Sequence, residues 1–196
     1  ASLNFMTNIT AVYLNNGTTI DTSSNNIAIN SAIYDGGAGG TLTKNGSGTL
    51  LLDGANYYPG ATLVTAGTLG GSGSLTGPLT VQSGASLAPG DNGIGTLTAG
   101  AVTLAAGSTT VMEVNGTTKA NDQLAASTVT YGGTLVLKNL DGQLAVNDTF
   151  TLFPTAGTGS FTIVSQTPGQ TVTWDTTQLN VDGTVKVLTV TASTPP

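Results

Sequence analysis

The sequence predicts an all-β fold in which short strands stack as successive turns of a coil. Three observations predict this architecture. The tripeptide Gly-Thr-Leu recurs along the chain, each time where a turn residue precedes a short alternating run. Strand-favouring Thr and Val are interleaved with 28 Gly residues and many Asn residues, which favour turns. Hydrophobic residues alternate at period two or occur in threes, and no segment has the periodicity of an amphipathic helix.

The tripeptide marks the repeat of the coil. Full copies begin at Gly40, Gly48, Gly67, Gly95 and Gly133, and a near copy begins at Gly183. Stacked-coil repeats usually span roughly 20–30 residues, which predicts roughly eight or nine coils in all. A β-sandwich is the alternative fold, since it also needs many short strands. We favour the coil because sandwiches rarely repeat a tripeptide at the starts of their strands.

Strands are expected in order along three stretches of the chain. In the first stretch, to about residue 40, turn sequences at residues 15–17 and 35–37 separate the strand-like runs. These runs lie at residues 9–14, 18–20 and 27–29. In the second stretch, Gly, Pro and Asn separate short strands expected at residues 50–52, 62–64, 79–81, 97–99 and 102–104.

The third stretch, from about residue 111, has longer strands and carries aromatic residues beyond position 140. Its strands are expected at residues 110–114, 134–137, 149–153 and 184–190. Repeat arrays need a cap over their last hydrophobic face, so we expect this stretch to close the coil. Residues 1–191 are therefore predicted to form a single module, and residues 192–196 to be the start of a linker or tail.

The composition excludes several classes of partner and chemistry. Only 7% of residues are charged, against roughly 25% in typical soluble domains. The net charge is −6 and the chain has no Arg, so it offers no basic cluster to nucleic acid or to an anionic membrane surface. No apolar stretch approaches the roughly 20 residues of a membrane span, so no membrane insertion is expected. Without Cys and His, disulfides, thiol nucleophiles, Cys/His zinc sites and imidazole acid–base chemistry are excluded.

One stretch of the sequence closely resembles a known repeat. Residues 42–50 read Leu-Thr-Lys-Asn-Gly-Ser-Gly-Thr-Leu and continue into residues 54–60 and 66–69, which together resemble the autotransporter-associated β-strand repeat. Segments that look like those commonly following this repeat lie at residues 87–90, 104–109, 173–176 and 182–184. The resemblance implies a right-handed parallel β-helix (solenoid) and a secreted or cell-surface bacterial protein.

A looser resemblance is to a xylan-binding β-helix family of carbohydrate-binding modules, attached to bacterial plant-polysaccharide hydrolases. It rests on the size of the chain, on its organisation as one free-standing module and on its content of aromatic residues. It implies a non-catalytic module that binds a plant cell-wall polysaccharide, with xylan favoured, and targets a fused glycoside hydrolase catalytic domain. The alternative function is a structural or adhesive passenger stalk of a secreted or surface bacterial protein.

Aromatic side chains are the candidate carbohydrate-binding residues, because sugar rings stack on aromatic planes without needing charge. These candidates are Tyr57, Tyr58, Trp174, Tyr34, Tyr131 and Tyr13. Tyr58 and Trp174 match residues that the repeat itself carries, so both are also expected as packing residues. Tyr57 departs from the repeat pattern, which commonly has a small polar residue there. The competing interpretation is that these side chains are half-buried and bond through their polar ends.

No catalytic residue and no metal ligand is predicted, and no cofactor is expected. Several Asp residues precede Gly, which is a turn signal: Asp35, Asp53, Asp141 and Asp182. Polar turns at residues 91–93 and 121–122 have the hard oxygen ligands that calcium prefers, but the turns alone also explain them. An enzyme on a polysaccharide-lyase or hydrolase β-helix is the third function considered, and two carboxyl groups facing one groove would favour it.

Overall fold

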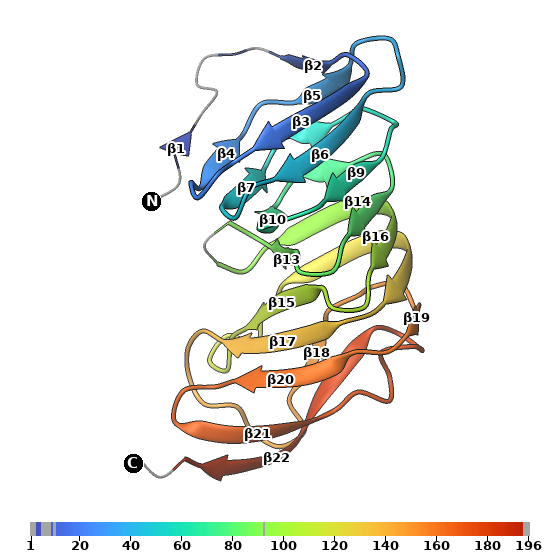
Figure 1. Ribbon diagram of the computed structural model, residues 1–196. Coiled ribbons are helices and arrows are strands. Elements are labelled where there is room, and N and C mark those ends of the chain that lie inside the picture. The colour runs from blue at the N-terminus through green and yellow to red at the C-terminus, as the bar shows by residue number, and fades with distance from the viewer. Residues whose placement is uncertain (1–2, 5–8, 10, 92, 194–196) are drawn as a thin grey trace.

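The computed structural model describes residues 3–4, 9, 11–91 and 93–193, and this part of the chain is a parallel β-solenoid with no helix. The all-β prediction is therefore confirmed. The first sheet follows the order β1, β4, β7, β10, β13, β15, β17, β20, all paired in parallel (Figure 1). Its strands are Leu3–Asn4, Ile27–Ile29, Thr49–Leu52, Thr68–Gly71, Ser86–Pro89, Thr109–Val114, Thr134–Asn139 and Thr162–Gln166, in that order.

The second sheet lies across the core from the first. Its main path runs β3, β6, β9, β12, β14, β16, β19, again with parallel pairing. These strands are Gly17–Asp21, Thr41–Asn45, Thr62–Val64, Leu79–Val81, Thr96–Leu104, Gln123–Tyr131 and Gly157–Gly159. The short strand β11 (Ser74–Leu75) pairs with β14, and β8 (Ala55–Asn56) pairs with β11. The strand β2 (Val12–Leu14) pairs separately with β5 (Ile33–Asp35).

The recurring tripeptide starts strands of both sheets. Copies at Gly48, Gly67 and Gly133 precede strands of the first sheet, whereas those at Gly40 and Gly95 precede strands of the second. In each copy Leu points inward and is buried, and Thr, one residue earlier, points outward. The tripeptide therefore indicates where a buried strand begins. It does not indicate how many residues one coil contains.

The core is a set of side-chain columns that run along the solenoid. One column of the first sheet stacks Leu50, Leu69, Leu87, Thr110 and Leu135 in direct register, each almost fully buried. Each buried Leu contributes about 2 kcal/mol as an upper estimate relative to the exposed side chain. Because each coil contacts only the coils above and below, this energy accumulates coil by coil.

Three sequence predictions about elements are corrected by the structure. The solenoid has about six turns, not eight or nine, and three of the strands beyond residue 145 form a separate antiparallel sheet. The strands expected at residues 97–99 and 102–104 are one strand, β14. In the run expected at residues 9–14, only β2 is strand, and residues 10 and 5–8 lie outside the described residues.

The antiparallel sheet closes the C-terminal end of the core, as expected for a cap. It consists of β18 (Thr149–Thr151), β22 (Thr184–Ala192) and β21 (Gln170–Asp175). Phe150 of β18 and Phe153, two residues after that strand, have buried side chains. In the described residues no helix is long and apolar enough to span a membrane.

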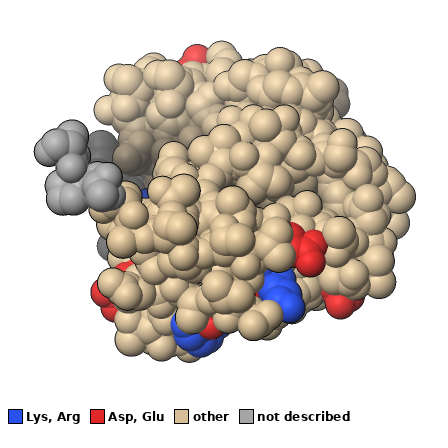
Figure 2. All heavy atoms as spheres, turned by 90° about the horizontal axis from the view of Figure 1, so that it is seen from below, with Lys and Arg blue, Asp and Glu red and all other residues tan. Residues whose placement is uncertain are grey.

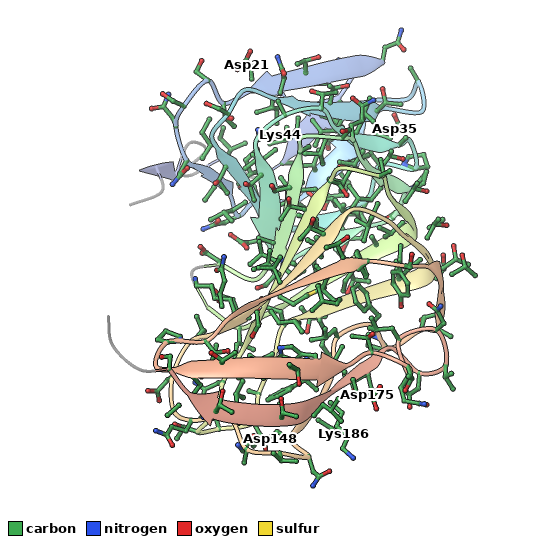
Figure 3. All side chains as sticks on the ribbon, turned by 60° about the horizontal axis from the view of Figure 1, so that its bottom comes forward. Asp21, Asp35, Lys44, Asp148, Asp175 and Lys186 are labelled. Carbon is green, nitrogen blue, oxygen red and sulfur yellow. The ribbon has the colours of Figure 1, made fainter. Side chains whose placement is uncertain are left out.

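A lysine lies inside the core of the second sheet near its N-terminal end. Lys44 of β6 stands in register between Ile20 and Val64 and is fully buried (Figure 3). Its ammonium group donates to the carbonyl oxygens of Asn45, Gly46 and Ala66 at 2.9, 2.8 and 2.9 Å. Burial lowers the pKa of Lys44, and the nearby charge of Asp21 opposes that shift. The buried ammonium group therefore joins the turns of two adjacent coils.

Candidate functional site

Three of the predicted aromatic residues form a stack on successive turns at the N-terminal end. The pairing of β2 with β5 places Tyr13 directly beside Tyr34. In the next turn the N–H of Tyr57 donates to the carbonyl of Ile33 at 2.7 Å, which continues the column. The ring centroids are 5.6 Å apart for Tyr13 and Tyr34 and 5.2 Å apart for Tyr34 and Tyr57. We call these three side chains the tyrosine stack.

The tyrosine stack is partly exposed. Tyr13 is 62% exposed and Tyr57 is 54% exposed, while Tyr34 between them is half-buried. The rings are tilted by only 30° and 24° to one another, so each ring covers part of its neighbour's face. In the following turn Thr76 donates to the carbonyl of Asn56, and the aromatic column ends there. The stack thus offers a short, uncharged aromatic surface and also holds the first turns together, since such pairs add about 0.5–1.5 kcal/mol each.

The other three predicted aromatic residues lie elsewhere and are not brought to this stack. Tyr58 is fully buried on the side opposite to Tyr57, and its hydroxyl bonds with the Thr62 hydroxyl at 2.7 Å. Tyr131 is buried near the C-terminal cap and donates to the carbonyl of Leu179 at 3.1 Å. Burial raises the pKa of both phenols to about 12. Neither ring is open to a ligand arriving from solvent.

Trp174 is a half-buried residue of the cap strand β21. Its indole N–H donates to the hydroxyl of Ser165 at 3.1 Å, and its ring lies 6.0 Å from the ring of Phe150. The side chain therefore packs within the cap and bonds to β20 through its polar end. This arrangement matches the packing interpretation that the repeat pattern suggested for Trp174.

Two carboxyl groups face one cavity on the outer face of the first sheet. The cavity, of about 170 Å³, lies beside β7, β10, β13 and β15 and is lined by Glu113 and Asp122 together with apolar side chains such as Leu51 and Val111. Both oxygens of the buried Asp122 accept main-chain N–H groups, from Gly95 at 2.9 Å and from Glu113 at 2.7 Å. An oxygen of Glu113 accepts from the ammonium of Lys138 at 2.8 Å.

These bonds give both carboxyl groups a structural use. Asp122 connects the loop before β14 to strand β15, and the Glu113–Lys138 pair connects β15 to β17. Asp122 has no exposed surface from which to exchange a proton with a substrate. The two carboxyl groups line one cavity, but the buried Asp122 lacks the accessibility that glycoside hydrolysis requires.

The free energy of unfolding is expected to fall as the pH rises, because Asp122 ionises. Burial, the largest effect, raises the pKa of Asp122 to about 7, helped by the charge of Glu113 and opposed by the two N–H donors and by Lys138. The folded state then keeps a proton that the unfolded state releases near pH 3.8, so the stabilisation is complete below that pH and is lost by about pH 7. We expect Asp122 to lower the free energy of unfolding by about 2 kcal/mol between roughly pH 5 and pH 7.5.

Urea denaturation at several pH values in this range measures how the free energy of unfolding changes with pH. The variant Asp122→Asn cannot ionise, so its curve is expected to be flatter, although one of its two main-chain bonds is lost. An equal slope in Asp122→Asn would assign the pH dependence to other groups.

The side chain of Asp35 stabilises the turn that follows it by bonding to the main chain of that turn. The carboxylate of Asp35 accepts the N–H groups of residues 37–40, and the donor at Gly40 is the largest cause of its lowered pKa. The two turns considered for calcium are brought together, since Asp122 binds the main chain of Gly95 just after residues 91–93. Within the described ranges, however, no three acidic side chains converge as metal ligands.

Some functional residues become neighbours only because strands of successive coils pair in register, and these contacts were not predicted from the sequence. Tyr13, Tyr34 and Tyr57 are each separated by about one repeat, and that spacing is the signal from which the stack could have been found. No repeat spacing links Glu113 and Asp122. They are neighbours because the turn at residues 115–120 brings Asp122 back to β15. Alternation places Lys44 on the same face as the buried Leu42, but a lysine is normally exposed, so residue type argued against its burial.

Comparison with known proteins agrees with the solenoid. Residues 42–70 match the family model described as Passenger-associated-transport-repeat. These residues begin within β6 and end within β10, so the match covers slightly more than one turn. The search of curated proteins found no match. The comparisons give no support to the xylan-binding family. The chain is thus a parallel β-solenoid that contains a turn similar to the repeats associated with passenger transport.

Proposed function

We propose that this chain is a structural segment of a passenger, a stalk, in a secreted or surface-exposed bacterial protein. The observation that carries the proposal is the passenger-associated repeat at residues 42–70, set in a solenoid whose core columns run from coil to coil. A rod of stacked coils needs no assembled active site, and its length grows by about 4.8 Å for each coil. This use fits the structural roles of Lys44 and Asp122.

The test is the location of the protein in its source bacterium. Antibodies against the folded chain should label intact cells or detect the protein in the culture medium, and protease added to intact cells should remove any cell-surface label. Recovery of the protein only from the cytosol, with intact cells unlabelled, would overturn the proposal.

A second candidate function is the binding of a neutral plant cell-wall polysaccharide, xylan first, at the tyrosine stack. The exposed surface of Tyr13 and Tyr57 favours it, because aromatic rings stack on sugar C–H faces. The surface is short, so we expect weak affinity, given the translational freedom that binding costs. If the chain is fused to a glycoside hydrolase, such binding would raise the local concentration of its substrate.

Affinity gel electrophoresis against soluble xylan, glucan, mannan and pectin measures this binding. Tyr34→Ala separates the outer rings of the stack, so we expect it to weaken retardation by xylan about tenfold, which corresponds to about 1.4 kcal/mol. Leu188→Ala, at an exposed position in the distant cap strand β22, is the matched control and should leave retardation unchanged. Absence of retardation by all four glycans, or equal loss in the control, would contradict polysaccharide binding.

A further inference from the structure

The outer face of the second sheet carries an ordered column of threonine side chains. Strand register places one outward residue from each coil directly beside the next, from β3 to β19. The positions, which we call the threonine column, are Thr19, Thr43, Leu63, Thr80, Thr103, Thr130 and Thr158. Leu63 is the single position that is not threonine. Each of these side chains is exposed or half-exposed.

A second column of small side chains lies beside the threonine column. It holds the residue two positions earlier in each coil, which faces the same side of an extended chain. These residues are Gly17, Thr41, Ala61, Pro78, Ala101, Thr128 and Ala156, and all of them are exposed. The small column leaves the threonine hydroxyl and methyl groups accessible from solvent.

This face has no charged side chain in either column. In Figure 3 the labelled charged residues lie towards the two ends of the solenoid, with Asp21, Asp35 and Lys44 near one end and Asp148, Asp175 and Lys186 near the other. Figure 2 shows the C-terminal end, where the charged atoms cover only small areas of the surface. Glu113 and Lys138 belong to the first sheet, away from this face. The surface therefore suits an electrically neutral partner.

The spacing and stiffness of the two columns create a regular grid. Neighbouring coils are about 4.8 Å apart, and alternate residues along one strand are about 6.6 Å apart. Threonine is branched at its β-carbon and has restricted side-chain rotamers, so its hydroxyl and methyl groups keep fixed positions. The parallel pairing on both sides of every inner strand prevents the backbone from moving independently. Long flexible side chains, which would disturb the grid, are absent from both columns.

We propose that this face binds the surface of ice. Ice is a neutral lattice whose water molecules repeat on the same scale as the grid, and threonine hydroxyls can take part in its hydrogen bonds while the methyl groups order water between them. Charged side chains would instead hold their own hydration shells, and neither column contains one; Asp21, at the end of β3, lies beside the columns at the N-terminal end of this face. A polysaccharide fits less well because neither column contains an aromatic ring. A second protein copy also fits less well, since the columns lack the large anchoring side chains of stable interfaces.

This inference goes beyond the stalk function and does not depend on polysaccharide binding. A protein exposed outside the cell meets ice directly when its surroundings freeze. The wall of the solenoid, and not its ends or the tyrosine stack, would make the contact.

Two measurements on the purified chain test the proposal. The chain should be taken up into slowly growing ice, and it should produce a gap between the melting and freezing temperatures of a small ice crystal. A double variant, Thr103→Lys and Thr130→Lys, places two flexible charges in the middle of the threonine column and should abolish both effects. Leu63→Thr completes the column and should widen the temperature gap.

The matched control places the same charges on the other sheet. Thr109 and Thr134 are neighbours in the first sheet and are half-buried outward threonines. The double variant Thr109→Lys and Thr134→Lys should keep the ice uptake of the unmodified chain. Circular dichroism shows that each variant remains folded. Exclusion of the unmodified chain from ice, without a temperature gap, would overturn the proposal, and so would equal loss in both double variants.

Discussion

Replacing Lys44 with alanine is expected to lower the free energy of unfolding by about 4 kcal/mol, a large fraction of the stability of a single domain. The substitution removes a buried aliphatic stem between Ile20 and Val64, which leaves a cavity in the core. It also removes the donor that the carbonyls of Asn45, Gly46 and Ala66 share. Buried acceptors without a donor cost about 1–3 kcal/mol each, although entering water can satisfy some of them.

Urea denaturation followed by circular dichroism measures this loss. Lys44→Met keeps most of the packing and removes only the charge and its bonds, so its loss should be smaller than that of Lys44→Ala. Lys186→Ala, at a half-buried position in the cap strand β22, is the control and should change stability by less than about 1 kcal/mol. A loss for Lys44→Ala no larger than for Lys186→Ala would show that the buried ammonium group does not hold the two turns together.

Replacing Phe153 with alanine is expected to cost about 4 kcal/mol and to act mainly at the C-terminal end. The Phe153 ring is fully buried, with its centroid 4.9 Å from that of Tyr131 and 5.9 Å from that of Phe161. The main chain at Phe153 also meets the cap, because its N–H donates to the carbonyl of Gly183 at 3.2 Å. Removing the ring therefore weakens the contact between the last coils and the antiparallel sheet.

Hydrogen exchange resolves where this stability is lost. In a stacked array each coil depends on its neighbours, so protection should fall most in β18, β21 and β22 and least in β6 and β9. Phe161→Ala, at a half-buried position in the same ring cluster, should have a smaller effect. Uniform loss of protection along the whole chain would indicate a single cooperative unit instead.

The fold could be predicted because its signals are local. A Gly before each Thr-Leu pair, together with period-two alternation, identifies strand starts without any knowledge of their partners. The number of coils could not be predicted, since it depends on how many residues each loop uses. The same tripeptide at Gly40 and Gly48 starts strands on two different sheets, which no local pattern reveals.

The candidate site was predicted only in part, for a related reason. Residue type identified Tyr13, Tyr34 and Tyr57 as aromatic candidates, but their association depends on register between coils. Residue type alone also could not separate the exposed Tyr57 from the adjacent, buried Tyr58. The threonine column was missed entirely, because threonine is common throughout the chain and its alignment appears only when the strands are paired.

The closed cap at one end and the stacked coils that precede it have a mechanical consequence. In Figure 1 the first coils and the cap lie at opposite ends of the solenoid. A force pulling these ends apart therefore loads the coils in series, and every coil carries the full tension. Such a rod yields at its weakest junction and lengthens in steps of one coil, so that extension dissipates the load gradually while the remaining coils keep their shape.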